Sequence, residues 1–278
     1  MKNTVLQWQS NDGVKIFGQQ WENDTQPAKA VICLVHGFGE HSSRYEHVAQ
    51  FFTDNQYAVI TYDARGHGKS EGKRGHFASY DEFLNDVNNL LKQADIHFPN
   101  LPIIIYGHSM GGQVVANFAI KHQPKVAGII LSSPFFQPGF APPALKIAAG
   151  KIMRNLIPSF SLPSGLDVNA ISRDKEVVKK YSNDPLVFDS ISSKMGIELI
   201  EFGAEAVQNA AKLSLPTLLF HGTADQLTSY NDSKKFAANA GKNVKFITYD
   251  GFYHECHNEP EKQVVLQNIL DWCNKLIG

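Results

Sequence analysis

Short apolar runs alternate along this chain with segments whose apolar residues recur at helical spacing, and this alternation restricts the fold more than any other feature. The expected strands are residues 31–35, 58–62, 102–106, 126–132, 217–220 and 244–249, and the expected helices are residues 44–55, 80–97, 110–122, 232–240 and 261–276. Runs such as Ile103-Ile104-Ile105 lack polar positions, which suits strands covered on both faces. The alternation predicts a doubly wound, mostly parallel α/β sheet.

The alternation is interrupted between residues 134 and 207, where prolines are frequent and no clear strand is visible. This segment predicts a cap inserted over the sheet, so that residues 1–133 and 208–278 form the core of one domain. Within the cap, residues 144–157 predict an amphipathic helix. Its expected apolar stripe consists of Leu145, Ala148, Ala149, Ile152, Met153 and Leu156.

The segment Gly107-His108-Ser109-Met110-Gly111-Gly112 fits the pattern G-x-S-x-G and lies between an expected strand and an expected helix. A nucleophile elbow requires that context, because a strained turn presents the serine above the edge of the sheet. Gly107 and Gly111 are expected to remove side chains that would clash where strand meets helix. Ser109 is therefore the predicted nucleophile, and the predicted architecture is the α/β-hydrolase fold with an inserted helical cap.

A serine hydroxyl is a weak nucleophile at neutral pH, so it needs a general base that is oriented by a carboxylate. In this fold the three residues follow one another in the order Ser, Asp, His. His254 lies in a loop after the last expected strand and is the predicted base. Asp225 lies on the loop after the preceding strand and is the predicted acid, whereas Asp232 is expected to cap or start a helix.

Acyl transfer also needs hydrogen-bond donors for the oxyanion that develops on the carbonyl. The backbone N–H of Met110 follows the nucleophile, and the loop after the first parallel strand offers the N–H of Phe38. These two groups form the predicted oxyanion hole. His36, at the start of the same loop, is expected to brace it rather than to take part in the chemistry.

Bulk properties exclude several other classes of protein. With 26 basic and 27 acidic residues the formal net charge is -1, which gives no field that would attract nucleic acid. His254-Glu255-Cys256-His257 has two residues between its histidines where the zinc motif H-E-x-x-H has three, so no metal and no cofactor are expected. The three cysteines contain no C-x-x-C pair, and the N-terminal residues show no signal-peptide pattern. Both observations predict a cytoplasmic location.

Four stretches of the chain resemble the monoacylglycerol lipases and the similar lysophospholipase-type hydrolases. They are residues 36–45 (HGFGEHSSRY), residues 63–72 (DARGHGKSEG), residues 107–112 (GHSMGG) and residues 253–257 (YHECH). The resemblance implies hydrolysis of a fatty acyl ester, with the acyl chain in a tunnel under an apolar cap and the glycerol near the triad. It also implies that Glu40, Arg44 and His257 bind the glycerol. The alternative for Glu40 and Arg44 is that they pair with each other and brace the loop.

Phe38 departs from the resemblance, because the animal members of the family have a small residue at this position. A backbone donor tolerates the change, but the side chain is expected to narrow the site and to affect the acyl and headgroup preference. Other functions therefore stay open at this point: a lysophospholipase or short-chain carboxylesterase, a peptidase of the proline-aminopeptidase type, and a non-catalytic binding protein on the same fold.

The cap helix gives a further prediction about partners. Its apolar stripe is expected to dock transiently on membranes or micelles, which would place the protein at the membrane periphery. The alternative is that the stripe packs only against the core.

Overall fold

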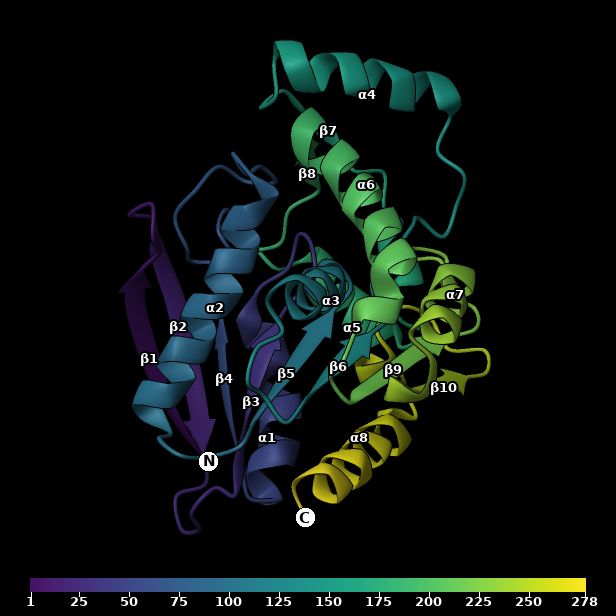
Figure 1. The fold of residues 1–278 in the computed structure, drawn as a ribbon. Coiled ribbons are helices and arrows are strands. Elements are labelled where there is room, and N and C mark those ends of the chain that lie inside the picture. Colours follow the sequence, from purple (N-terminus) through teal and green to yellow (C-terminus); the bar gives the residue numbers. More distant parts are fainter.

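An eight-stranded sheet forms the centre of the computed structural model, which describes residues 1–278 (Figure 1). In sheet order the strands are β1 (Lys2–Gln9), β2 (Lys15–Glu22), β4 (Tyr57–Tyr62), β3 (Ala30–Val35), β5 (Ile103–His108), β6 (Gly128–Ser132), β9 (Thr217–Gly222) and β10 (Val244–Tyr249). β2 pairs antiparallel with β1 and with β4, and all other pairs in this sheet are parallel. The mostly parallel sheet is confirmed, and each expected strand agrees with the structure to within two residues at either end.

Helices cover both faces of the sheet, as a doubly wound sheet requires. The helices of the core are α1 (Glu46–Asp54), α2 (Tyr80–His97), α3 (Met110–His122), α7 (Tyr230–Ala240) and α8 (Lys262–Ile277). Successive residues of β3 alternate between two apolar clusters: Ile32 packs with the residues of α1 and α8, and Cys33 packs with those of α2 and α3. The three cysteines are free and buried, as expected for Cys33.

The N-terminal hairpin of β1 and β2 is absent from the sequence prediction. Every second residue of β1 is exposed, so the strand contains no continuous apolar run. The register pairs Lys2 with Glu22 and Gln9 with Lys15, and the segment Asn11-Asp12-Gly13 forms the turn. That turn sequence, with the alternating pattern before it, is the signal that could have revealed the hairpin.

The cap lies between β6 and β9 and contains more regular structure than the sequence predicted. Its elements are α4 (Ala144–Leu156), β7 (Ser161–Pro163), α5 (Lys175–Ser182), β8 (Ser190–Ser192) and α6 (Ser193–Asn209). The expectation of no strand is wrong, because β7 and β8 form a short antiparallel ribbon. Helix α6 leaves the cap and runs into the core, where it packs on α3 and α7 and buries Met195 and Leu199.

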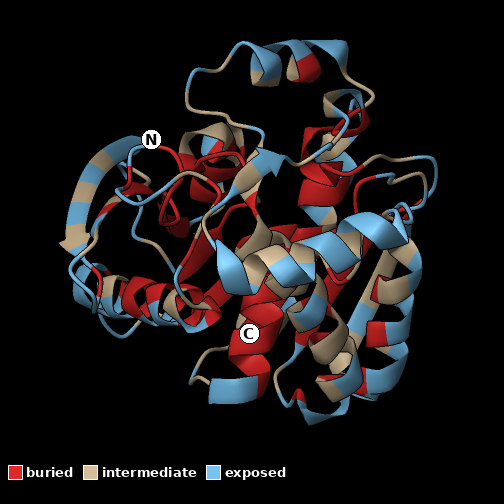
Figure 2. Ribbon diagram, turned by 90° about the horizontal axis from the view of Figure 1, so that it is seen from above, coloured by how far each residue is buried: buried red, intermediate tan, exposed pale blue.

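Helix α4 forms where the sequence predicts it, but its apolar stripe is divided between an inner and an outer face. The helix lies across one end of α6, and none of its residues is buried (Figures 1 and 2). Met153 and Gly150 face the interior, where a side chain on Gly150 would come within 3.0 Å of Ile197. Leu145, Ile152 and Leu156 of the predicted stripe are 82%, 60% and 71% exposed. The alternative in which this stripe packs only against the core is therefore excluded for these three residues.

None of the helices combines the length and the apolar character that a bilayer-spanning segment needs.

Candidate active site

Ser109 occupies the turn between β5 and α3 in a strained backbone conformation, with φ 52° and ψ -117°. Its N–H donates to the carbonyl of Ser132 at 2.9 Å, and its own carbonyl accepts the N–H of Phe135 at 2.9 Å, so neighbouring segments fix the turn. A Cβ on Gly107 would lie 2.5 Å from the carbonyl oxygen of Gly111, and one on Gly111 would lie 2.2 Å from that of Val35. The predicted strained elbow and the need for both glycines are confirmed. Strain of this kind costs about 1–3 kcal/mol and is common at functional sites.

Asp225 and His254, which are far apart in the sequence, meet beside this turn. The loops after β9 and β10 carry them, and His254 Nδ1 lies 2.8 Å from Asp225 Oδ2. Burial, the largest influence, lowers the pKa of His254, but the charge and hydrogen bond of Asp225 and the charges of Glu255 and Glu40 together raise that pKa above its ordinary value of 6.5. Burial alone would raise the pKa of Asp225, but the charge of His254 and its hydrogen bonds lower it far below the ordinary range. The pair therefore suits a base that takes up a proton and is stabilised as an imidazolium.

Two further side chains donate to Asp225, and the sequence prediction did not identify either of them. His221 Nε2 lies 2.9 Å and Thr228 Oγ1 lies 2.8 Å from Asp225 Oδ2. Both residues are buried. His221 lies four residues before the predicted acid, at the end of β9, and Thr228 lies three residues after it. This closeness in sequence is the signal that could have identified them.

The loop after β3 brings the predicted oxyanion donor Phe38 to the nucleophile. His36 Nε2 accepts the N–H of Ala64 at 2.9 Å, so the proton is on Nδ1, which lies 2.7 Å from the carbonyl oxygen of Gly37. The predicted bracing role of His36 is confirmed. The N–H of Phe38 has no acceptor within the protein, and Met110 is the first residue of α3, where N–H groups lack intrahelical partners.

Phe38 lies in the cavity wall. Its ring makes edge contacts with Phe188 and His67, at centroid distances of 5.5 and 5.8 Å. The ring is therefore fixed by a residue of the cap and a residue of the core.

Glu40 lies in the cavity wall, and its carboxylate already has three donors within the protein. It accepts hydrogen bonds from the N–H of Gly37 at 2.7 Å, from the Tyr45 hydroxyl at 2.6 Å and from the guanidinium of Arg44. The same guanidinium donates two bonds of 2.8 Å to Glu255. Arg44 and Glu40 therefore pair and brace the loop, which is one of the two roles that the sequence left open.

Arg44 and His257 do not reach the cavity, although the resemblance suggests that they contact glycerol. Arg44 is enclosed by the two carboxylates and by Tyr181, whose ring centroid lies 4.6 Å from the guanidinium carbon. His257 is 1% exposed, stacks on Tyr45 at 5.1 Å and meets the ring of His108 edge-on at 4.8 Å. Of the three suggested glycerol ligands, the structure brings only Glu40 to the cavity wall.

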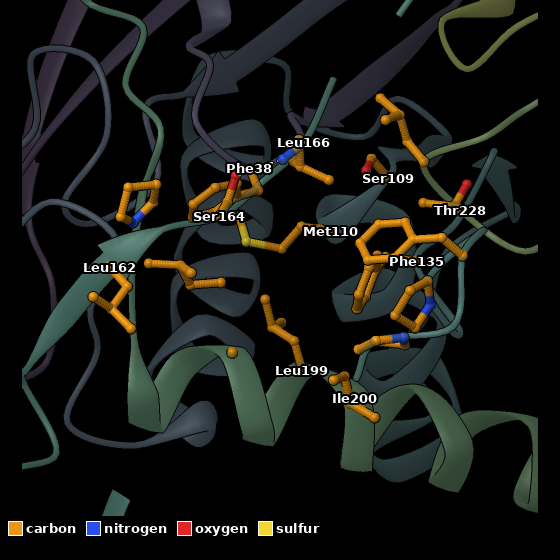
Figure 3. A pocket seen from close by; sticks show the side chains of 18 of the residues that line it. Phe38, Ser109, Met110, Phe135, Leu162, Ser164, Leu166, Leu199, Ile200 and Thr228 are labelled. Atoms are coloured by element: carbon orange, nitrogen blue, oxygen red, sulfur yellow. Dashed lines mark hydrogen bonds between the residues drawn. The ribbon is translucent and has the colours of Figure 1, made fainter. Parts of the chain in front are cut away.

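Ser109 and His254 line a cavity of about 300 Å³ beneath the cap. In Figure 3, Ser109 and Thr228 lie in the upper part of the view, and Leu199 and Ile200 of α6 lie below them. Apolar side chains from the core and the cap form most of the wall; they include Met110, Phe135, Ile147, Met153, Leu162 and Ile197. The polar lining side chains Glu40, His108, Thr228, His254 and Glu255 come from the core, as Ser109 does, and Lys146, Ser164, Asp167, Ser192 and Ser193 come from the cap. A mostly apolar wall with the reactive side chains on its core side suits a molecule with one long apolar part and one polar end.

No group of three or more metal-ligating side chains is arranged to hold a metal ion. In the segment that resembles the zinc motif, Glu255 binds Arg44 and Asn258 instead.

Comparisons with known proteins agree with this geometry. A family model described as serine aminopeptidase, S33 matches residues 26–261. A monoacylglycerol lipase of Mycolicibacterium smegmatis is 36% identical over 94% of this chain and 93% of its own length. A phospholipase of Bacillus subtilis is 31% identical over 86% of this chain and 92% of its own length. The crystal structure of a monoacylglycerol lipase from Paleococcus ferrophilus superposes with a TM-score of 0.85, at 31% identity over 94% of this chain and 98% of that one.

Proposed function

The chain belongs to the serine aminopeptidase S33 family of α/β-hydrolases, together with monoacylglycerol lipases, and we propose that it hydrolyses monoacylglycerol to fatty acid and glycerol. One observation carries the proposal. The strained Ser109 and His254, which pairs with the buried Asp225, line one cavity together with the polar side chains of Glu40 and Thr228, and the wall of this cavity is otherwise mostly apolar. An ester with one fatty acyl chain and a small alcohol fits that division.

The proposed reaction passes through an acyl-enzyme. Ser109 Oγ attacks the ester carbonyl while His254 Nε2 takes its proton, and Asp225 stabilises the imidazolium through Nδ1. The backbone N–H groups of Phe38 and Met110 donate to the oxyanion, each contributing about 3 kcal/mol to the stability of the transition state. His254 then returns the proton to the glycerol oxygen, the C–O bond breaks, and glycerol leaves. Water, activated by the same histidine, finally releases the fatty acid and restores Ser109.

The glycerol is expected at the end of the cavity where Glu40 lies. The Glu40 carboxylate is fixed by three donors, so it can accept a further hydrogen bond from a hydroxyl without moving. We assign Arg44 a supporting role through Glu40, and we place His257 behind His108. The three charges of Glu40, Arg44 and Glu255 leave this end of the cavity with a net negative charge, which a neutral alcohol tolerates better than a phosphate does.

Rates on a matched panel of esters test the proposal. The panel contains monoacylglycerols, lysophospholipids and short-chain esters of graded length, and kcat/KM is expected to be highest for a monoacylglycerol. Ser109→Ala is expected to lose about 10⁶-fold in kcat. Retained turnover by S109A would refute the proposed nucleophile, and failure of the wild-type protein to cleave any ester would refute the function.

A lysophospholipase is the second candidate, because a relative of similar length is a phospholipase. The same panel separates the two, since a lysophospholipase would prefer the lysophospholipid at equal chain length. The family model is described as an aminopeptidase, so peptidase activity is a further alternative. Including an acyl amide and an aminoacyl amide in the panel tests it.

We propose further that the outer face of α4 docks on anionic lipid surfaces. Leu145, Ile152 and Leu156 lie on that face. Residues 134–166 contain no Asp or Glu, and the exposed Lys146 and Lys151 have no carboxylate partner, whereas Arg154 pairs with Glu201. An apolar stripe flanked by unpaired lysines suits the interface of a bilayer that carries anionic lipid. The three unpaired thiols agree with a reducing compartment, so the proposed location is the cytoplasmic side of such a membrane.

Vesicle flotation tests the docking with a matched pair of triple variants. Replacing Leu145, Ile152 and Leu156 by glutamine is expected to abolish binding to vesicles that contain phosphatidylglycerol. The control replaces Val5, Ile96 and Val264, which are 66%, 67% and 56% exposed but lie on β1, α2 and α8, and it is expected to bind like the wild type. Equal binding by both variants, or binding that is indifferent to the anionic lipid, would contradict the proposal.

A further inference from the structure

The carboxylate of Asp225 receives hydrogen bonds from three side chains rather than from His254 alone. Oδ2 accepts from His254 Nδ1 at 2.8 Å, from His221 Nε2 at 2.9 Å and from Thr228 Oγ1 at 2.8 Å. Oδ1 accepts the backbone N–H groups of Leu227 at 2.8 Å and Thr228 at 3.1 Å. The side chains of Asp225 and His221 are both 0% exposed, so water cannot replace His221 as a donor.

His221 is itself fixed by helix α7. Its Nδ1 lies 2.8 Å from the hydroxyl oxygen of Ser233, which is fully buried. Since Nε2 must carry a proton to donate to a carboxylate, Nδ1 of the neutral ring accepts the Ser233 hydroxyl proton. Tyr230 of the same helix packs edge-on against the ring at 5.9 Å. A continuous chain of hydrogen bonds therefore runs from Ser233 through His221 and Asp225 to His254.

We propose that His221 is a positioning residue for the hydrolysis, which orients Asp225 toward His254 and withdraws part of the carboxylate charge from the base. The inference rests on the proposed function, because it takes His254 as the general base. Each hydrogen bond to a carboxylate spreads its negative charge and restricts its rotation. When the bond from His221 is lost, Asp225 Oδ2 keeps more of its negative charge toward His254, and the carboxylate is held less firmly in place.

This arrangement predicts the direction of a pH effect. A stronger interaction with Asp225 favours the imidazolium form of His254, so the pKa of His254 rises when the donor on His221 is removed. The other titratable groups that face this chain are His108, Glu255 and Glu40 around His254, Cys256 near Asp225, and Tyr230 against His221. A substitution at His221 leaves all of them in place, so the shift reports the change at Asp225.

Two substitutions at His221 separate the donor from the bulk of the ring. His221→Leu removes the donor, and kcat/KM for p-nitrophenyl butyrate is expected to fall by about 10- to 100-fold, the range typical for losing an outer hydrogen-bond partner of a functional side chain. The acid limb of the pH profile is expected to move upward by roughly half a pH unit or more. His221→Gln offers an amide N–H at a similar reach and is expected to restore both the rate and the position of the limb.

The outcomes separate this inference from the proposed function. If the wild-type protein hydrolyses no ester, the proposed function fails. If the wild type is active and H221L matches it in rate and pH profile, or H221Q falls as far as H221L, the positioning role is refuted. If H221L shows no cooperative thermal unfolding, the substitution Ser233→Ala tests the positioning role instead. It removes the hydroxyl that fixes the ring of His221, so the acid limb of the pH profile is expected to shift in the same direction by a smaller amount. An unshifted limb in S233A would overturn the inference.

Discussion

Replacing Arg44 by methionine removes the positive charge that lies between two buried carboxylates. The side chains of Arg44, Glu40 and Glu255 are 10%, 3% and 3% exposed, so solvent does little to screen the charges that are left. Removing one partner of a buried ion pair costs about 3–5 kcal/mol in free energy of unfolding. For 278 residues the entropy of unfolding is about 0.6 kcal/mol per kelvin, so this loss lowers Tm by about 5–9 °C.

The same substitution changes how stability depends on pH. In the wild type, burial is the largest influence and raises the pKa of Glu255, but the charge and hydrogen bonds of Arg44, with smaller effects of His257 and His108, together hold that pKa well below its ordinary value. A depressed pKa contributes stability that is present above the unfolded-state pKa and is lost as the pH falls through the folded-state pKa. In R44M burial dominates, so the pKa of Glu255 rises above the unfolded value. The destabilisation is then largest near neutral pH and is relieved as the pH falls.

Thermal unfolding at about pH 7 and about pH 5 tests both statements. The expected result is a difference in Tm between wild type and R44M that narrows on acidification. Arg154→Met is the matched control, because its pair with Glu201 is 24% and 44% exposed and contributes less than about 1 kcal/mol. A loss in R44M no larger than that in R154M, or a difference that widens at low pH, would refute the buried network as the cause.

Three further predictions concern the site itself. Asp225→Asn is expected to lower kcat by about 10⁴-fold without loss of folding, because an amide does not select the required tautomer of His254; a fall below tenfold would speak against Asp225 as the acid. The acid limb of kcat/KM is expected to lie above pH 6.5, since the pKa of His254 is raised, and a limb below that value would contradict the cited interaction with Asp225. Phe38→Ala keeps its backbone N–H and is expected to retain hydrolysis while improving kcat/KM for bulkier alcohols by about tenfold; a loss comparable to that of S109A would mean that the ring itself is needed.

The core of the fold could be predicted because its strands are covered on both faces. Runs such as Ile103-Ile104-Ile105 leave no polar position, and the helices between them repeat their apolar residues at a regular spacing. Strand β1 escaped prediction because half of its residues face solvent. Helix α6 escaped because it follows a proline-rich segment, although Met195 and Leu199 are spaced as one buried helical face.

Site residues could be predicted only where a short sequence motif identifies their role. Ser109 is defined by glycines within two residues of it, and the structure shows the strained turn that they allow. The contact between Arg44 and Glu255 joins residues 211 positions apart, so no local pattern reports it. His221 was overlooked for a different reason: a histidine at the end of a strand is unremarkable until the carboxylate that it faces is known.

The most direct test of the account is to find where a fluorophosphonate probe reacts. The probe phosphonylates a serine only when a base has activated it, and peptide mass spectrometry then identifies the modified residue. One adduct is expected, on Ser109, and it is expected to form rapidly in the wild-type protein, slowly in D225N, and not at all in S109A. An active protein whose adduct lies on another residue, or that forms no adduct, would contradict the central claim that Ser109, His254 and Asp225 act together.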